Sequence, residues 1–287
     1  MTAPRSSMLL ILSAFALALS GCAQAPASSP GGPAAPPQAD ALSHVHGIGT
    51  VEGDAAVLLA THTGVYRVDA AGSTSGPLGG NDFDAMGFTV VDDALLASGH
   101  PGPTTPAELG SPNLGIIRSD DGGLTWRPVS QTGVEDFHVL TAAPDGTLYG
   151  VGSTAPNVRS SPDGGSTWSA GAALPVADLA TGANGALYAA TEDGLQVSTD
   201  GGGSFSLVPD APLLFQIAGS ADGMLIGAGT DGLLWRSLPG GGWESGEPFQ
   251  GRLQALAAGE GTDVLLVDDR GLVRVGDGGA SVILPAG

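Results

Sequence analysis

The chain has 287 residues, of which 42% are hydrophobic and only 13% are charged, enough apolar material for one large domain or two small ones. Its 29 acidic residues outnumber nine basic ones, all of them arginine, and the net charge of -20 would repel a phosphate backbone, which excludes nucleic acid as a partner. The 48 glycines and 21 prolines favour many short strands joined by tight turns, so the fold is expected to be all-β.

An export signal is predicted at residues 1–21. Arg5 precedes an apolar run, Met8 to Leu19, that is too short for an ordinary membrane span but fits a signal peptide. The run ends in LSGC, which resembles the lipobox of bacterial lipoproteins. This resemblance implies cleavage before Cys22 and attachment of a lipid to its thiol. Cys22 is the only cysteine, so no disulfide can form within the chain.

Residues 22–42 are predicted to be a flexible tether. The stretch after Cys22 is rich in proline, alanine, serine and glycine and has none of the aromatic or β-branched residues that build a core. A lipid anchor followed by a tether predicts an exported protein held on the outer face of the bacterial cell membrane. The folded part, residues 43–287, is expected to be a monomer.

A short motif of the form Ser-x-Asp-x-Gly-x-Thr/Ser-aromatic occurs three times, and a worn copy, SLPGGGW, begins at Ser237. The copies recur about every 40 residues, and each follows three short apolar strands. Four strands per unit predict a β-propeller. Six units are expected, and a seventh is disfavoured because no further strand set is found. The units begin near His44, Asp82, Asp136, Val176, Leu213 and Arg252.

The motif is similar to the Asp-box, or BNR repeat, of sialidases. Residues 43–287 also resemble bacterial surface lipoproteins described as sialidase-like glycosyl hydrolases, in stretches such as HVHGIG, LLASGHPG and EDFHVL. The resemblance implies that each box forms the turn between the third and fourth strands and that its aromatic residue packs between blades. The residues given this structural role are Ser119, Asp121, Gly123, Trp126, Ser161, Asp163, Gly165, Trp168, Ser198, Asp200, Gly202 and Phe205.

Sialidase chemistry is not expected. A sialidase needs three converging arginines, and only Arg252 and Arg270 lie away from the box turns. Whether the chain is an enzyme stays open, with a non-catalytic role preferred. If it is one, it should be a glycoside hydrolase whose acid and base come from carboxylates on the face opposite the boxes. These carboxylates are Asp82, Asp84, Glu135, Asp136, Glu192 and Asp268.

All five histidines are predicted to reach that same face. His44 and His46 are two residues apart on a short strand, so both point to one side of it. Aligning the inner strands of the first three units places His46, Met86 and His138 at matching positions beside the central channel. Loops between second and third strands supply the remaining two. The predicted ligand-binding or metal-binding residues are His44, His46, His62, Met86, His100 and His138.

Three interpretations of this face are open. Imidazole with thioether or carboxylate ligands suits copper, and imidazole with carboxylate suits zinc. The same groups could instead hydrogen-bond a carbohydrate or protein ligand. The face could also carry no site, in which case the propeller would be a non-catalytic assembly or adhesion module. A proline-rich insertion at residues 100–115 is either a rim or lid of this face or a plain surface loop.

Overall fold

The computed structural model describes residues 42–220 and 222–287, and it is all-β within them. The predicted signal peptide, the lipidation site at Cys22 and nearly all of the predicted tether lie outside these residues. The described residues contain no helix that is long and apolar enough to cross a membrane.

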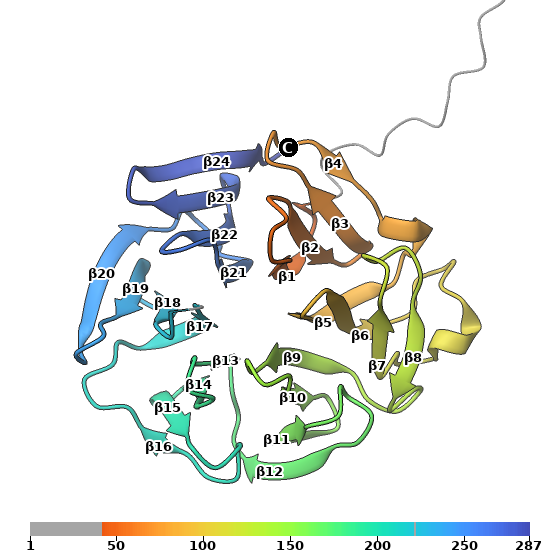
Figure 1. Cartoon of the computed structure of the whole chain (residues 1–287), viewed down its shortest axis with the longest axis horizontal. Helices are drawn as coiled ribbons and strands as arrows, with labels where there is room; N and C mark the ends of the chain where they lie inside the picture. The colour runs from red at the N-terminus through yellow and green to blue at the C-terminus, as the bar shows by residue number, and fades with distance from the viewer. Residues whose placement is uncertain (1–41, 221) are drawn as a thin grey trace, which may run out of the picture. The chain divides into compact units, whose positions relative to one another are not determined.

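Six four-stranded antiparallel sheets are arranged as blades around a central axis (Figure 1), which confirms the predicted six-bladed β-propeller. Blades 1 to 3 contain β1 (Val45–Thr50), β2 (Val57–Thr61), β3 (Gly64–Val68), β4 (Thr74–Ser75), β5 (Asp84–Val91), β6 (Ala94–His100), β7 (Ile116–Ser119), β8 (Arg127–Ser130), β9 (Phe137–Ala142), β10 (Leu148–Gly152), β11 (Ala155–Ser161) and β12 (Ser169–Ala173).

Blades 4 to 6 contain β13 (Asp178–Thr181), β14 (Leu187–Thr191), β15 (Gly194–Ser198), β16 (Ser206–Leu207), β17 (Leu214–Gly219), β18 (Leu225–Gly229), β19 (Leu233–Ser237), β20 (Trp243–Pro248), β21 (Ala255–Ala258), β22 (Val264–Asp268), β23 (Gly271–Gly276) and β24 (Gly279–Pro285). Two short 3₁₀ turns, η2 (Leu78–Gly80) and η3 (Ala107–Leu109), lie before and within blade 2. Each blade begins within three residues of its predicted start.

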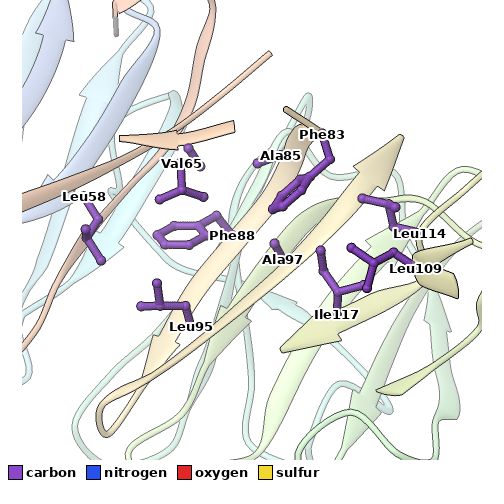
Figure 2. Close-up of a cluster of buried hydrophobic side chains, with 11 residues drawn as sticks. Leu58, Val65, Phe83, Ala85, Phe88, Leu95, Ala97, Leu109, Leu114 and Ile117 are labelled. Carbon is purple, nitrogen blue, oxygen red and sulfur yellow. The ribbon is translucent and has the colours of Figure 1, made fainter. Parts of the chain in front are cut away.

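The hydrophobic core consists of six separate clusters, one at each interface between neighbouring blades. The second strand of a blade is buried on both faces, as the uniformly buried VLLAT of β2 and VLLVD of β22 show. Figure 2 shows the cluster between blades 1 and 2, where Phe88 and Leu95 of blade 2 meet Leu58 and Val65 of blade 1. Every blade therefore depends on both neighbours for its burial.

The repeated motif forms the turn between the third and fourth strands of blades 2, 3 and 4, where it was predicted. In blade 3 the Ser161 hydroxyl donates to Asp163 Oδ1 at 2.8 Å and accepts from the Gly165 amide at 2.9 Å. Asp163 also accepts from the amide and hydroxyl of Thr167. The hydroxyl bond from Thr167 is the largest of the interactions that lower the pKa of Asp163 to about 2. The equivalent turns at Asp121 and Asp200 have the same bonds.

The motif glycines and aromatic residues have separate structural roles. Gly123, Gly165 and Gly202 have φ values of 90°, 89° and 86°, a left-handed conformation that favours glycine. Trp126 packs edge-on against Phe83, and Trp168 stacks on Phe137 at the interface between blades 2 and 3. The motif thus sets the turn and contributes an aromatic residue to the core between blades.

The inner strands approach each other closely near the axis. A Cβ atom placed on Gly219 of β17 would lie 1.9 Å from the carbonyl oxygen of Thr181 in β13. The carbonyl oxygen belongs to the backbone and the Cβ position is fixed by it, so the clash could be relieved only by moving one inner strand. Only glycine therefore fits where these inner strands of blades 4 and 5 meet.

We expect Gly219→Ala to destabilise the propeller by about 1–3 kcal/mol, because the added methyl group forces two blades apart. Urea unfolding followed by fluorescence measures this change. Gly240→Ala is the matched control, since a Cβ there meets no atom within 4 Å and the glycine is not in the left-handed region. Equal stabilities of the two variants would contradict the close approach of the inner strands.

Candidate metal site at one mouth of the channel

The inner strands present side chains to the channel through β-bulges. The register of the inner strand shifts around His46 in blade 1, Met86 in blade 2 and His138 in blade 3. A bulge leaves one residue unpaired and redirects its side chain. All three residues line a cavity of about 360 Å³ enclosed by the inner strands of the six blades. The structure therefore places these three predicted residues around one channel.

Three of the predicted residues form a group that we call the first cluster: His46, His62 and Asp84. His62 Nδ1 lies 2.7 Å from Asp84 Oδ2, and His46 Nε2 lies 3.3 Å from Asp84 Oδ1. The same two ring nitrogens are 3.3 Å from each other. His46 comes from the bulge of β1, His62 from the β2–β3 turn and Asp84 from the first residue of β5. Blade 1 thus supplies both imidazoles and blade 2 the carboxylate.

The second cluster is formed by His100, Asp136 and His138. Both imidazoles approach one carboxylate oxygen, with His100 Nε2 at 3.0 Å and His138 Nε2 at 2.6 Å from Asp136 Oδ2. His100 ends β6, whereas Asp136 and His138 lie at the start of the inner strand of blade 3. In each cluster a histidine from one blade therefore contacts an aspartate from the next blade.

The two clusters are direct neighbours. Asp84 of the first cluster and His100 of the second are paired across β5 and β6. Residues directly opposite in an antiparallel pair point to the same side of the sheet, about 5 Å apart. The two groups therefore belong to one surface that spans blades 1 to 3.

The carboxylates are poorly solvated. Only 1% of the Asp136 side chain is exposed, and its Oδ1 atom is buried without a hydrogen-bond partner. Asp84 Oδ1 is also buried and has close contact with His46 but no hydrogen bond of proper geometry. Burial by itself raises the pKa of Asp84, but hydrogen bonds and charge from His46 and His62 outweigh burial and hold the pKa below its usual value. Both groups thus place a carboxylate where it needs a cation.

The donor atoms of the first cluster suit a metal ion better than protons alone. His46 Nε2 and His62 Nδ1 face each other, so only one of the two can donate a proton to the other, and both also face Asp84. Ligand atoms held about 2.0–2.1 Å from a tetrahedral zinc lie about 3.3 Å from one another. Two of the three separations in this cluster have that value, whereas the third, 2.7 Å between His62 Nδ1 and Asp84 Oδ2, would lengthen on metal binding. In each cluster the possible ligand atoms all lie within 4.8 Å of one another.

The remaining predicted residues have other environments. His44 is exposed, and its ring centroid lies 4.9 Å from that of His62. Glu135 is buried against Arg159 and the Thr154 backbone, and Asp268 is buried against Arg270. The structure brings neither carboxylate into the clusters.

Asp82 and Glu192 also lie apart from the clusters. Asp82 accepts bonds from Thr104 and Thr105 and so fixes the proline-rich insertion, whose Leu109 and Leu114 are buried in the core. The insertion is therefore packed against blade 2. Glu192 is an exposed residue of the β14–β15 turn.

Asp178 is a channel residue that sequence reasoning missed. It begins β13, lines the cavity with His46 and His138, and accepts the backbone amides of Leu179 and Ile217. Burial in the channel wall is the dominant influence and raises its pKa to about 7, although the two amides oppose the shift. The sequence feature that could have indicated Asp178 is an aspartate at the start of an otherwise apolar inner strand.

Comparisons with known proteins identify the fold alone. No family model matches the chain, and no curated protein matches it. Virginiamycin B lyase from Staphylococcus aureus is 16% identical over 83% of each chain, with a TM-score of 0.53. A gluconolactonase from Xanthomonas campestris is 15% identical over 80% of this chain and 84% of its own, with a TM-score of 0.58. An ancestral GH74 enzyme is 18% identical over 85% of this chain and 38% of its own, with a TM-score of 0.52.

The raised pKa of Asp178 makes the stability of the propeller depend on pH. The folded chain holds a proton that the unfolded chain releases near pH 3.8, so this stabilisation is full below that pH and is lost as the pH rises through about 7. We expect Asp178→Asn to flatten the fall in unfolding free energy between pH 5 and pH 8. Urea titrations at both pH values measure the effect. Asp193→Asn, in an exposed turn, is the control, and equal pH dependence in both variants would contradict the assignment.

Proposed function

We propose that the chain is a surface-anchored β-propeller lipoprotein that binds a divalent transition metal through the first and second clusters. The observation that carries this proposal is the convergence of two imidazole nitrogens and a carboxylate in the first cluster, where His46 Nε2 lies 3.3 Å from both partners, the separation of ligands around tetrahedral zinc. The second cluster, one blade further along, repeats the same ligand types.

Zinc is the preferred metal. Both clusters consist of nitrogen and oxygen donors, which suit zinc, and two histidines with one carboxylate form a ligand set found in zinc sites that keep a position open. Met86 lines the same channel, but the donor atoms in contact with one another in the two clusters are nitrogen and oxygen. Copper, which thioether ligands would favour, is therefore the second choice.

A glycoside hydrolase is less well supported. The resemblance of the turn motif to the Asp-box favours kinship with sialidase-like propellers, but fold does not imply activity. Of the carboxylates predicted for such chemistry, Glu135 and Asp268 are held by arginines, and Asp84 and Asp136 are engaged by histidines. These four carboxylates are therefore already engaged, which disfavours them as the acid and base that glycoside hydrolysis requires.

We expect the purified full-length chain, in detergent and without a histidine tag, to bind two zinc ions. The double variant His62→Ala/His100→Ala removes one imidazole from each cluster and should weaken zinc binding about 100-fold or more. Isothermal titration and elemental analysis measure affinity and stoichiometry. Glu192→Gln is the control, because it changes an exposed carboxylate outside both clusters. Zinc binding that is absent, or that is unchanged in the double variant, would refute the proposal.

The anchor is proposed from the LSGC sequence and the tether behind it. Replacing the cysteine thiol by a hydroxyl removes the atom that would carry the lipid. We therefore expect Cys22→Ser to leave the protein uncleaved or to release it into the medium. Fractionation of bacterial cells, with mass spectrometry of the N-terminal peptide, checks this. A variant that stays with the membranes and keeps the parent's N-terminus would contradict lipidation at Cys22.

A further inference from the structure

We infer that the two clusters are different kinds of metal site: His44 closes the first as a fourth protein ligand, whereas the second keeps one coordination position open for an oxyanion. This inference rests on the proposed metal binding. It concerns how each metal would be coordinated once bound. Three observations support it: the left-handed backbone of His44, the pairing of His100 with Asp84, and the exposed imidazoles of the second cluster.

The backbone at His44 is held in an unfavourable conformation. Its φ value is 53°, in the left-handed region that costs a residue with a Cβ atom about 1–2 kcal/mol. Such conformations persist where the surroundings or a function require them. Here the conformation places the imidazole of His44 beside that of His62, with ring centroids 4.9 Å apart and planes tilted by 38°. The ring is exposed, and a turn of this side chain is the movement that would bring one of its nitrogens to the first cluster.

The second cluster has no equivalent of His44. His44 directly precedes Val45, which pairs with Thr61, so His44 lies opposite His62 at the ends of β1 and β2. The residue opposite His100 in blade 2 is Asp84. Asp84 is already in contact with both imidazoles of the first cluster. Asp84 therefore belongs to the first cluster and does not supply a fourth ligand to the second, which has three protein ligands.

Solvent exposure agrees with this difference. Both imidazoles of the second cluster are half-exposed, His100 at 46% and His138 at 52%. In the first cluster His62 is likewise 45% exposed, whereas His46 and Asp84 are only 21% and 18% exposed. The second cluster therefore opens to solvent above a fully buried carboxylate. A zinc site with three protein ligands keeps its fourth position for water or an exchangeable ligand.

The charge at the second cluster favours an anionic oxygen donor. Two neutral imidazoles and one carboxylate leave a divalent metal with a net charge of +1. The chain as a whole is strongly acidic, but charges beyond about 8 Å are largely screened at physiological ionic strength. An oxyanion can reach this metal from solvent, because both imidazoles are half-exposed. We therefore assign the open position to a small oxyanion, for which inorganic phosphate is the probe.

Cobalt(II), a coloured substitute for zinc, tests the inference in two full-length variants. His100→Ala/His138→Ala keeps only the first site, and His46→Ala/His62→Ala keeps only the second. We expect saturable addition of phosphate to change the visible spectrum of cobalt in the second site and to leave that of the first unchanged. Adding His44→Gly to the first-site chain should weaken cobalt binding about 10-fold or more and make its spectrum sensitive to phosphate.

Glycine is chosen at position 44 because it adopts the left-handed conformation without strain, so the change removes the imidazole and preserves the backbone. Ser43→Ala is the control for a change at the neighbouring exposed residue. Phosphate sensitivity in the unaltered first site, or an unchanged cobalt affinity after His44→Gly, would overturn the role of His44. A second site that binds cobalt but ignores phosphate would overturn the open position. Failure of either site to bind cobalt or zinc would instead refute the proposed function and this inference with it.

Discussion

Burial of apolar side chains between neighbouring blades is the interaction on which the rest of this structure depends. Among the described residues, each sheet consists of four consecutive strands, so no strand is shared between the two ends of the propeller. The ring closes through packing, where Leu59 and Tyr66 of blade 1 meet Leu265 and Leu272 of blade 6. Gln254 adds one hydrogen bond across this junction, to the amide of Val45. Truncating one such leucine costs about 2–5 kcal/mol, a large share of the stability of a typical domain.

The packing between blades also determines the geometry of the two clusters. Each joins a histidine of one blade to an aspartate of the next, so its distances are set by the relative position of two blades. The interface between blades 1 and 2 is filled by Phe83, Phe88 and their neighbours (Figure 2), which limits movement of the first cluster. A metal bound there would join blade 1 to blade 2 and, through the second cluster, blade 2 to blade 3. Metal binding and ring stability are therefore coupled physically.

The fold could be predicted well from the sequence because the spacing of the repeated motif corresponds directly to one blade. One turn motif in each of several blades fixes the spacing, and the apolar strands between copies fix the strand count. The face that carries the histidines also followed from topology, since strand direction alternates within a blade. What could not be predicted was which side chains would meet. Asp84 and Asp136 were candidate catalytic carboxylates in the event that the chain is an enzyme, and their contacts with histidines were not predicted.

The side-chain contacts could not be predicted because periodicity shows on which face of a strand a residue lies, but not the direction of a side chain at a β-bulge. His46 and His138 occupy equivalent bulges, yet His46 meets the aspartate of the next blade and His138 that of its own. Asp178 was missed because its environment, a channel wall with two amide donors, is assembled from β13 and β17. Glu135 could not be assigned to a structural role before Arg159 was seen beside it. The contacts of His46 and Asp178 are made between blades, and those of His138 and Glu135 are made within blade 3 but outside the repeated motif.

Buried carboxylates in this propeller have two kinds of partner, arginine and histidine, and the two kinds differ in whether they need a species from the solvent. Arg159 and Arg270 each place a permanent positive charge beside Glu135 and Asp268, because a guanidinium group keeps its proton. Such ion pairs need no proton or metal ion from the solvent. An imidazole neutralises a carboxylate only when it gains a proton or holds a metal, so Asp84 and Asp136 depend on a species supplied by the solvent. A buried carboxylate with that dependence costs stability whenever the cation is missing. The propeller places both such groups side by side on one face and uses arginine for Glu135 and Asp268, which is the arrangement expected if that face exists to capture a cation.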